Sequence, residues 1–299
     1  MAYKRMGFAL SGLRSCLGRA RRYGTLVMFG HTVFSLSFAA LSLLCASGGR
    51  PRFATLFWAG LAFLSARTGA NALNRAVDAQ IDGRNPRTAG RQIPRGEVTS
   101  GETLALSAVC FLLLIFSAGM LNPVCLLLSP LALLLMSGYS YTKRFTWLCH
   151  LVLGVTCACA PVGAWLAVTG RFALRPLLLG AANCLWTAGF DILYGTQDYE
   201  FDLAHGLYSI PVRFGLRRAL QISAAFHLLA LLALLAFGLL EARMGPLFWM
   251  GFAGIAALMA LQHRMVTPNR RDKAQLASYN VSQLTSLLLL FCGVLDVYL

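Results

Sequence analysis

Nine apolar runs, each about 20 residues long, dominate this sequence and limit what it can fold into. A helix needs about 20 predominantly apolar residues to cross the hydrocarbon core of a bilayer. The predicted spans are residues 25–46, 53–74, 103–121, 123–141, 147–169, 175–197, 219–240, 245–263 and 277–298. Composition agrees, because 58% of the 299 residues are hydrophobic and only 12% are charged, against roughly 25% charged in soluble domains. We therefore predict an all-α, polytopic membrane bundle with nine transmembrane helices.

The Lys and Arg residues predict how these spans are oriented. With a cytoplasmic N-terminus, 20 of the 26 Lys and Arg residues fall in cytoplasmic segments, 5 fall outside, and Arg67 lies within a span. Membrane proteins carry such an excess in their cytoplasmic loops, so the formal net charge of +15 implies no nucleic-acid partner. We expect a basic N-terminal segment at residues 1–24, either a helix on the membrane surface or a flexible tail. Residues 25–299 are expected to form a single transmembrane domain.

The acidic residues are concentrated in two short stretches, at the ends of the second and sixth spans. The side chains that share a helical face are Asn74, Asp78 and Asp82 in the first stretch and Asp191, Tyr194, Asp198 and Asp202 in the second. Residues three or four apart lie on one face of a helix. A carboxylate near hydrocarbon is costly, so in a membrane protein it marks a functional site.

Two carboxylate stripes that face each other would repel unless cations lay between them. Hard oxygen ligands at this density suit Mg²⁺, which proteins hold through a few carboxylates together with substrate phosphate. The two stripes therefore predict that Mg²⁺ and a diphosphate bridge the two stretches.

Basic residues beside the two stretches would complete a diphosphate site. Arg75 adjoins the first stripe, Arg91 lies in the loop at residues 83–96, and Tyr139, Lys143 and Arg144 end the fourth span. Arg and Lys side chains clamp phosphate oxygens. Arg67, which is charged within a span, is expected to face a polar cavity and to meet the carboxylate of an acceptor. The similar placing of the two acidic stretches also makes an internal duplication plausible.

At these residues the chain resembles the UbiA-type family of intramembrane prenyltransferases, nearly end to end. The matching motifs are Asn74-xxx-Asp78-xxx-Asp82, Arg87-Thr88-Ala89-x-Arg91 with Pro94-x-Gly96, Tyr139-xxx-Lys143 and Asp191-xx-Tyr194-xxx-Asp198-xxx-Asp202. The resemblance implies a nine-span bundle around a central cavity that opens laterally to lipid, in the inner membrane of a bacterium. It implies a Mg²⁺-diphosphate site whose ligands are Asn74, Asp78, Asp82, Asp198 and Asp202. Tyr139 and Lys143 would assist there.

The form of the first motif is similar to the branch labelled 4-hydroxybenzoate polyprenyltransferase-like, part of which serves menaquinone synthesis through the futalosine route. By this resemblance Asp191 and His31 would face an aromatic acceptor. The chain departs from the common pattern at two positions. Many members carry Asp where this chain has Arg75, and the branch commonly carries Glu where Gly30 precedes His31.

The expected reaction is Mg²⁺-dependent transfer of a polyprenyl group from a polyprenyl diphosphate to a hydroxylated aromatic acid, of the 4-hydroxybenzoate or dihydroxynaphthoate type, in respiratory quinone synthesis. Asp191 and Tyr194 are the candidate catalytic residues. Aromatic faces at Trp186, Phe190 or Tyr194 would stabilise an allylic cation, although ordinary helix packing explains them equally well.

Four alternatives stay open. The acceptor could be a compound other than an aromatic acid, and a membrane transporter would also place acids near the bilayer. A CDP-alcohol phosphotransferase is disfavoured because its Asp-Gly-xx-Ala-Arg pattern is missing after Asp82-Gly83. A quinone-binding protein without catalytic activity would need neither stripe.

Overall fold

The computed structural model of the chain describes Gly24, Leu26 and residues 33–299, and these parts are helical, with no β-strand. The long helices are α2 (Val33–Ser47), α3 (Phe53–Val77), α5 (Ser100–Leu121), α6 (Pro123–Thr142), α7 (Cys149–Thr169), α8 (Leu174–Gly195), α10 (Ile210–Leu240), α11 (Pro246–Met265) and α12 (Ser282–Tyr298). Shorter segments are α4 (Ala79–Arg84), the 3₁₀ turn Thr196–Asp198, α9 (Tyr199–Ala204) and the π-helical segment Leu276–Val281.

The helical class of the prediction is confirmed, and the long helices follow the predicted spans. Within the described residues, seven helices are long and apolar enough to cross a membrane. α2 is described over 15 residues only, and α3 is long enough but carries Arg67 and Arg75 among its apolar residues. The count of nine spans therefore stays a prediction. The predicted segment 1–24 lies outside the described residues except for Gly24, and the domain division also stays a prediction.

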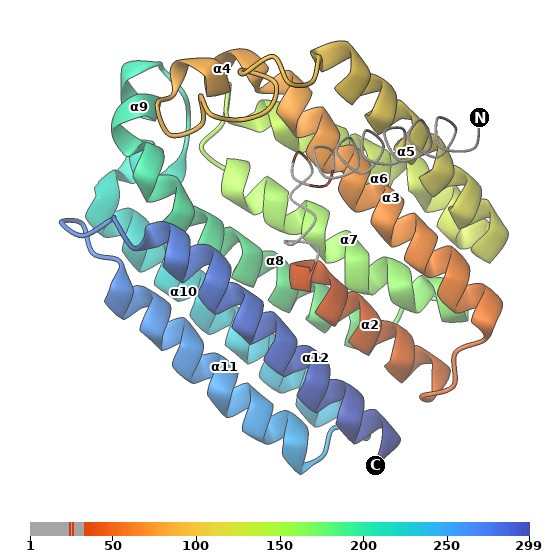
Figure 1. The fold of residues 1–299 in the computed structure, drawn as a ribbon. Coiled ribbons are helices and arrows are strands. Elements are labelled where there is room, and N and C mark those ends of the chain that lie inside the picture. The colour runs from red at the N-terminus through yellow and green to blue at the C-terminus, as the bar shows by residue number, and fades with distance from the viewer. Residues whose placement is uncertain (1–23, 25, 27–32) are drawn as a thin grey trace, which may run out of the picture.

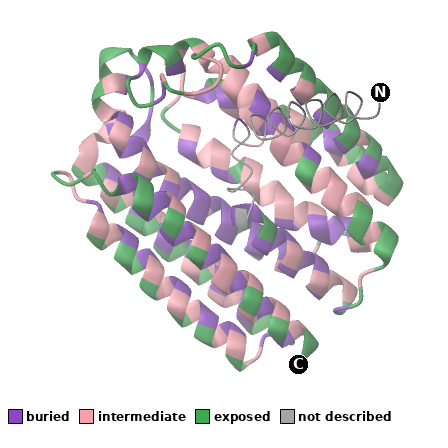
Figure 2. Ribbon diagram, in the orientation of Figure 1, coloured by how far each residue is buried: buried purple, intermediate pink, exposed green. Residues whose placement is uncertain are grey.

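Successive long helices run antiparallel and pack into one bundle (Figure 1). α8 packs between α7 and α10, α3 packs on α5, and α2 contacts both α7 and α12. Buried residues are concentrated along α8 at the centre of the bundle, whereas exposed residues lie along the outer helices (Figure 2). Many of these exposed residues are Leu and Phe. Exposed Leu and Phe side chains on the outer surface fit contact with lipid.

Local sequence signals explain several helix ends. The side chain of Thr99 accepts from the backbone of Glu102, whose carboxylate accepts from Thr99 in return, so that a capping box begins α5. Asn122 caps α6, and Pro123 follows at its first position. Gly170 ends α7 with φ of 62°, a left-handed conformation that glycine adopts at no steric cost. These ends keep α5, α6 and α7 close to their predicted limits.

α7 and α8 approach each other closely at Gly154, where a Cβ atom would meet the backbone carbonyl of Cys184. We expect Gly154→Ala to destabilise the protein by roughly 1–3 kcal/mol, because the two helices cannot separate without loosening the core. Gly163 lies on the same helix with no atom within 4 Å of its Cβ position. Gly163→Ala should be neutral or stabilising by up to about 1 kcal/mol, since alanine favours helix. Thermal unfolding in detergent measures both; equal melting temperatures would contradict the close packing.

The two motif-bearing connections lie at the same end of the bundle, beside α4 and α9, and the C-terminus lies at the other end (Figure 1). From the Lys and Arg distribution we expect the motif end to be cytoplasmic. Single cysteines at Glu97, Ala204 and Leu299 in a cysteine-free background test this orientation. In intact cells an impermeant maleimide should label only the cysteine at position 299. Labelling of position 97 or 204 from outside would reverse the assignment.

Candidate active site

The two acidic stretches meet at one end of the bundle and line a common cavity of about 260 Å³. Each stretch bends where it leaves its helix. α3 ends at Val77 and Asp78 forms the junction with α4, whereas α8 ends at Gly195 and continues through the 3₁₀ turn into α9. The hydroxyl of Thr196 donates to the carbonyl of Leu193 at this second bend, at 2.6 Å.

The two predicted stripes converge on one cavity, although neither lies on one unbroken α-helix. The tighter winding of the 3₁₀ turn at Thr196–Asp198 interrupts the 3.6-residue repeat of α8. Asp198 contacts Asn85 and Arg87 of the loop between α4 and α5, and Asp202 contacts Lys143, which follows α6.

The carboxylates of the first stretch are held by amide and guanidinium groups. Asn74 Nδ2 donates to Asp78 at 2.8 Å, and Arg144 reaches the other oxygen of Asp78 at 3.1 Å. Arg91 donates to Asp82 at 2.6 Å, and the guanidinium of Arg75 lies 3.9 Å from the same carboxylate. Asp78 and Asp82 are thus each paired with a cation of the chain itself.

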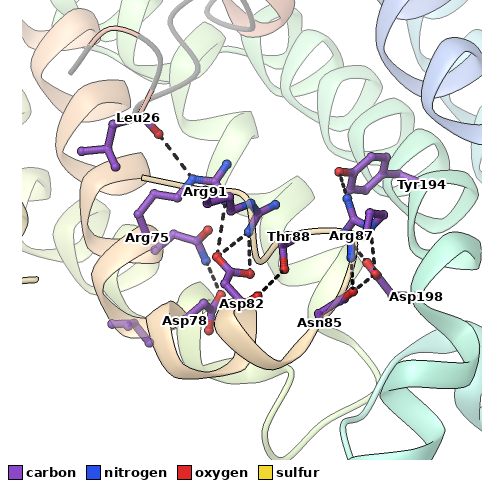
Figure 3. Close-up of polar contacts among 12 residues, drawn as sticks. Leu26, Arg75, Asp78, Asp82, Asn85, Arg87, Thr88, Arg91, Tyr194 and Asp198 are labelled. Carbon is purple, nitrogen blue, oxygen red and sulfur yellow. Dashed lines mark hydrogen bonds and ion pairs between the residues drawn. The ribbon is translucent and has the colours of Figure 1, made fainter. Parts of the chain in front are cut away.

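The carboxylates of the second stretch are paired in the same way, as Figure 3 shows for Asp198. Arg87 binds Asp198 through two nitrogens, Nε at 2.9 Å and Nη2 at 2.6 Å, and its Nη1 donates to the hydroxyl of Tyr194. Asn85 Nδ2 donates to Asp198 at 2.8 Å. Lys143 lies 2.8 Å from Asp202, which is almost fully buried. Arg and Lys side chains thus pair with the carboxylates of both stripes, whereas Mg²⁺ between the stripes stays a prediction.

Burial and these ion pairs shift the ionisation of the groups outside the membrane-spanning helices. Burial raises the pKa of Asp78 above its usual value, and the positive charge of Arg144 opposes this rise only in part. Burial acts to lower the pKa of Lys143, but the negative charge of Asp202 and Asp198 outweighs burial and the pKa is raised. The surroundings therefore compensate the negative charge of Asp78 only in part, whereas they stabilise the positive charge of Lys143.

The structure brings together nearly all of the predicted site residues. Those that line the cavity are Arg67, Asn74, Arg75, Asp78, Asp82, Arg91, Tyr139, Lys143, Asp191, Tyr194, Asp198 and Asp202. Arg144 does not line it and reaches Asp78 from outside the cavity. Trp186 is buried in the apolar core, whereas Phe190 lies in the cavity wall. His31 lies outside the described residues.

The residues present fit a magnesium ion in donor chemistry. Carboxylates from both stretches and the amide of Asn74 face one cavity, and Asp202 Oδ1 is buried without a hydrogen-bond partner among the described residues. In the described part of the chain no three His, Cys, Asp or Glu side chains stand close enough to hold a metal by themselves. Mg²⁺ usually keeps several waters and is bound by one or two carboxylates plus substrate phosphate, so a closed cage is not required.

Some residues of the site were not selected from the sequence. Asn85 and Arg87 lie in the motif loop, and their roles on Asp198 depend on how that loop folds back. His150 pairs with Asp191 at 2.7 Å, but in the sequence it suggested only a metal cluster with Cys157 and Cys159, whose spacing matches no familiar zinc site. No local pattern in the sequence marks the last of these residues, Tyr279.

Tyr279 projects into the cavity from the π-helical segment before α12. Its ring centre lies 4.6 Å from that of Tyr194 and 6.3 Å from that of Phe34. Such π-helical turns inside α-helices occur frequently at functional sites. The single extra residue shifts the register of the helix, which no apolar periodicity in the sequence reveals.

Comparisons with known proteins agree with this architecture. The sequence model of the UbiA prenyltransferase family matches residues 35–288. The 4-hydroxybenzoate octaprenyltransferase of Aeromonas salmonicida is 33% identical over 276 residues, which cover 92% of each chain. The apo structure of a UbiA homologue from Aeropyrum pernix K1 superposes with a TM-score of 0.80 at 32% identity, over 90% of this chain and 98% of that one.

A more distant structure shares the fold alone. The UbiA homologue from Archaeoglobus fulgidus bound to GPP and Mg²⁺ has a TM-score of 0.67 at 18% identity, over 93% of this chain and 100% of that one. The family match covers most of the chain and includes both acidic stretches. This chain is therefore a membrane-embedded enzyme that belongs to the UbiA prenyltransferase family.

Proposed function

We propose that this enzyme transfers a polyprenyl group from a polyprenyl diphosphate to a ring carbon of a hydroxylated aromatic acid, a step of respiratory quinone synthesis. One observation carries the proposal. A single cavity joins a charged end, made by the two carboxylate stretches, to a wall of aromatic side chains, and it also contains Arg67 and Asp191. The acceptor would be of the 4-hydroxybenzoate or dihydroxynaphthoate type, and the names of the curated relatives support the former.

The charged end is suited to a magnesium-bound diphosphate because its carboxylates and cations could exchange partners. The carboxylates would bind Mg²⁺ and the Arg and Lys side chains would bind the diphosphate. Each of the four carboxylates now neutralises an Arg or Lys of the chain. On binding, Asn74, Asp78, Asp82, Asp198 and Asp202 would hold Mg²⁺, and Arg75, Arg91, Tyr139 and Lys143 would serve the diphosphate oxygens. Arg144, which does not line the cavity, would stay paired with Asp78. Bound Mg²⁺ supplies charge that stabilises the departing diphosphate.

The aromatic wall is suited to the allylic end of the substrate. Phe190 and Tyr194 follow each other by one turn of α8, and Tyr279 lies against Tyr194. Aromatic faces attract a cation, and the attraction grows when water is excluded. As the bond between allylic carbon and oxygen lengthens, positive charge would develop against these rings, while its electron pair leaves with the diphosphate.

The acceptor would bind deeper in the cavity, beyond the diphosphate. Asp191 lies on α8, seven residues before Asp198 in the following 3₁₀ turn, and Arg67 enters the same cavity from α3. Arg67 would pair with the acceptor carboxylate, and Asp191 would accept a hydrogen bond from its phenol. A phenol makes the ring electron-rich, which prenylation of a ring carbon requires. His31, on the segment before α2, is a further candidate for the acceptor side.

We also propose that the enzyme resides in the inner membrane of a bacterium with its N-terminus in the cytoplasm. This is supported by the bacterial sources of the curated relatives and by the distribution of Lys and Arg. A polyprenyl tail could then remain in lipid while its diphosphate enters the cavity from the cytoplasmic end.

An assay of the purified protein with defined substrates tests the proposed function. Geranyl and longer polyprenyl diphosphates are supplied with 4-hydroxybenzoate, 1,4-dihydroxy-2-naphthoate or a neutral long-chain alcohol, with Mg²⁺ or with excess EDTA. We expect a prenylated aromatic acid and stoichiometric diphosphate, both lost in EDTA and restored by added Mg²⁺. Prenylation of the alcohol with no product from either acid would place the enzyme in another branch of the family. Metal-independent turnover would reject the magnesium assignment.

A further inference from the structure

Asp191 and His150 form a buried pair in the cavity wall that is separate from the four carboxylate–cation pairs. His150 Nδ1 lies 2.7 Å from Asp191 Oδ2, and the side chains are 6% and 27% exposed, respectively. Both residues line the cavity. They come from different helices, α7 and α8, so that the pair depends on how these helices pack.

The imidazole ring is held by α8 over one full turn. A Cβ atom on Gly195 would lie 3.0 Å from His150 Cε1, so the absence of a side chain at this position makes room for the ring. Asp191 and Gly195 are four residues apart and share one face of α8. The imidazole ring therefore packs against Gly195, and its Nδ1 contacts Asp191 one turn earlier. Both contacts together set the orientation of the ring.

The hydrogen bond has a defined direction. With Asp191 as a carboxylate, which can only accept, Nδ1 carries the hydrogen and donates it to Asp191 Oδ2. His150 Nε2 is buried and has no hydrogen-bond partner among the described residues. No donor to the other oxygen of Asp191, Oδ1, is found in the described part of the chain, and the side chain is partly exposed in the cavity. Oδ1 is thus the atom of the pair that a substrate can reach.

We propose that Asp191 Oδ1 takes the proton from the prenylated ring carbon and that His150 is the positioning residue that holds the Asp191 side chain correctly oriented for this step. The inference rests on the proposed function, because it requires an aromatic acceptor in the cavity. A carboxylate alone within a membrane-spanning helix is costly, and a donated hydrogen bond from His150 offsets part of that cost.

The chemical step balances without any further reactant. The allylic carbon–oxygen bond breaks and its electron pair leaves with the diphosphate, while π electrons of the ring form the new carbon–carbon bond. The ring carbon–hydrogen bond then breaks, its electron pair restores the aromatic ring, and the proton passes to Asp191 Oδ1. A carboxylate that accepts a hydrogen bond from the phenol stands next to the adjacent ring carbon. One group can therefore orient the acceptor and receive its proton.

Four variants and an isotopically labelled acceptor test the proposal. Asp191→Asn keeps the shape but removes the base, His150→Phe removes the donor, and His150→Gln restores a donor of similar reach. His227→Gln is the matched control, since His227 is a buried histidine that pairs with His263 at 2.9 Å and does not line the cavity. Each is assayed with the aromatic acid in ordinary form and deuterated at the ring carbon that becomes prenylated, and folding is checked by thermal unfolding.

We expect kcat to fall by roughly 100-fold or more in Asp191→Asn and about 10- to 100-fold in His150→Phe, with KM for the prenyl diphosphate unchanged. Ring deprotonation should become slow in both variants, so that a primary kinetic isotope effect absent from the wild type appears. His150→Gln should recover most of the activity, and His227→Gln should match the wild type.

Two results would overturn the inference alone, in an enzyme whose wild type prenylates the aromatic acid. One is full activity in His150→Phe. The other is a loss of kcat without an isotope effect in either variant, which would show that the pair acts only on structure. If the wild type prenylates no aromatic acid, the proposed function fails and this inference fails with it.

Discussion

Asp78→Asn and Asp198→Asn are each expected to lower turnover by on the order of 1000-fold while the protein still inserts and folds. Each substitution removes one negative charge from a different acidic stretch, and the two stretches face one cavity. A bound metal supplies several kcal/mol of charge stabilisation in the transition state, and each 1.36 kcal/mol corresponds to tenfold in rate. The side-chain shape is preserved, so the loss reports charge rather than packing.

The measurement is kcat at saturating prenyl diphosphate and acceptor, together with the Mg²⁺ concentration that gives half-maximal rate. Asp272→Asn is the matched control, because Asp272 is exposed in the connection between α11 and the π-helical segment. It should leave turnover unchanged. Near-normal activity of either stretch variant at saturating Mg²⁺ would reject the assignment of that stretch to the metal.

Arg87→Lys is expected to lower turnover by roughly 100- to 1000-fold, the usual cost of losing a donor that stabilises developing charge. Among the described residues, only Arg87 connects the loop after α4 to both Asp198 and Tyr194, which it contacts through three nitrogens. Its pKa is raised, because its hydrogen bonds to Asp198 outweigh the effect of burial, so it stays charged. Lysine keeps the charge but cannot bind a carboxylate through two nitrogens and reach a phenol with a third.

Arg84→Lys is the control for this prediction. Arg84 lies three residues earlier at the end of α4 and is exposed. The Arg84→Lys enzyme should retain full turnover. Equal melting temperatures of the two variants would show that the loss of turnover in Arg87→Lys arises in the site and not from unfolding. An Arg87→Lys enzyme with normal kcat would show that the loop is held to α8 by other contacts.

The sequence by itself determined the fold class, the approximate limits of the long helices and the two acidic stretches of the candidate site. These features depend on neighbours along the chain: the length of an apolar run, a capping box such as Thr99 with Glu102, or carboxylates four residues apart. Such signals act over one or two helical turns, and a sequence contains them in full. The family resemblance added the cavity and the likeness to prenyltransferases, and the family itself is confirmed by the comparisons.

Only the tertiary structure decided which cation pairs with which carboxylate. Arg87 lies 111 residues before Asp198, and His150 lies 41 residues before Asp191. These contacts arise where α4, α6, α7 and α8 come together, beside the 3₁₀ turn at Thr196–Asp198 and beside Gly195, which makes room for His150. No periodic pattern in the sequence predicts either feature. Side chains brought together by packing cannot be paired from spacing alone, because the distance between helices is set by the whole bundle. The residues of the charged end were therefore predictable from the sequence, whereas their ion pairs and the Asp191–His150 contact were not.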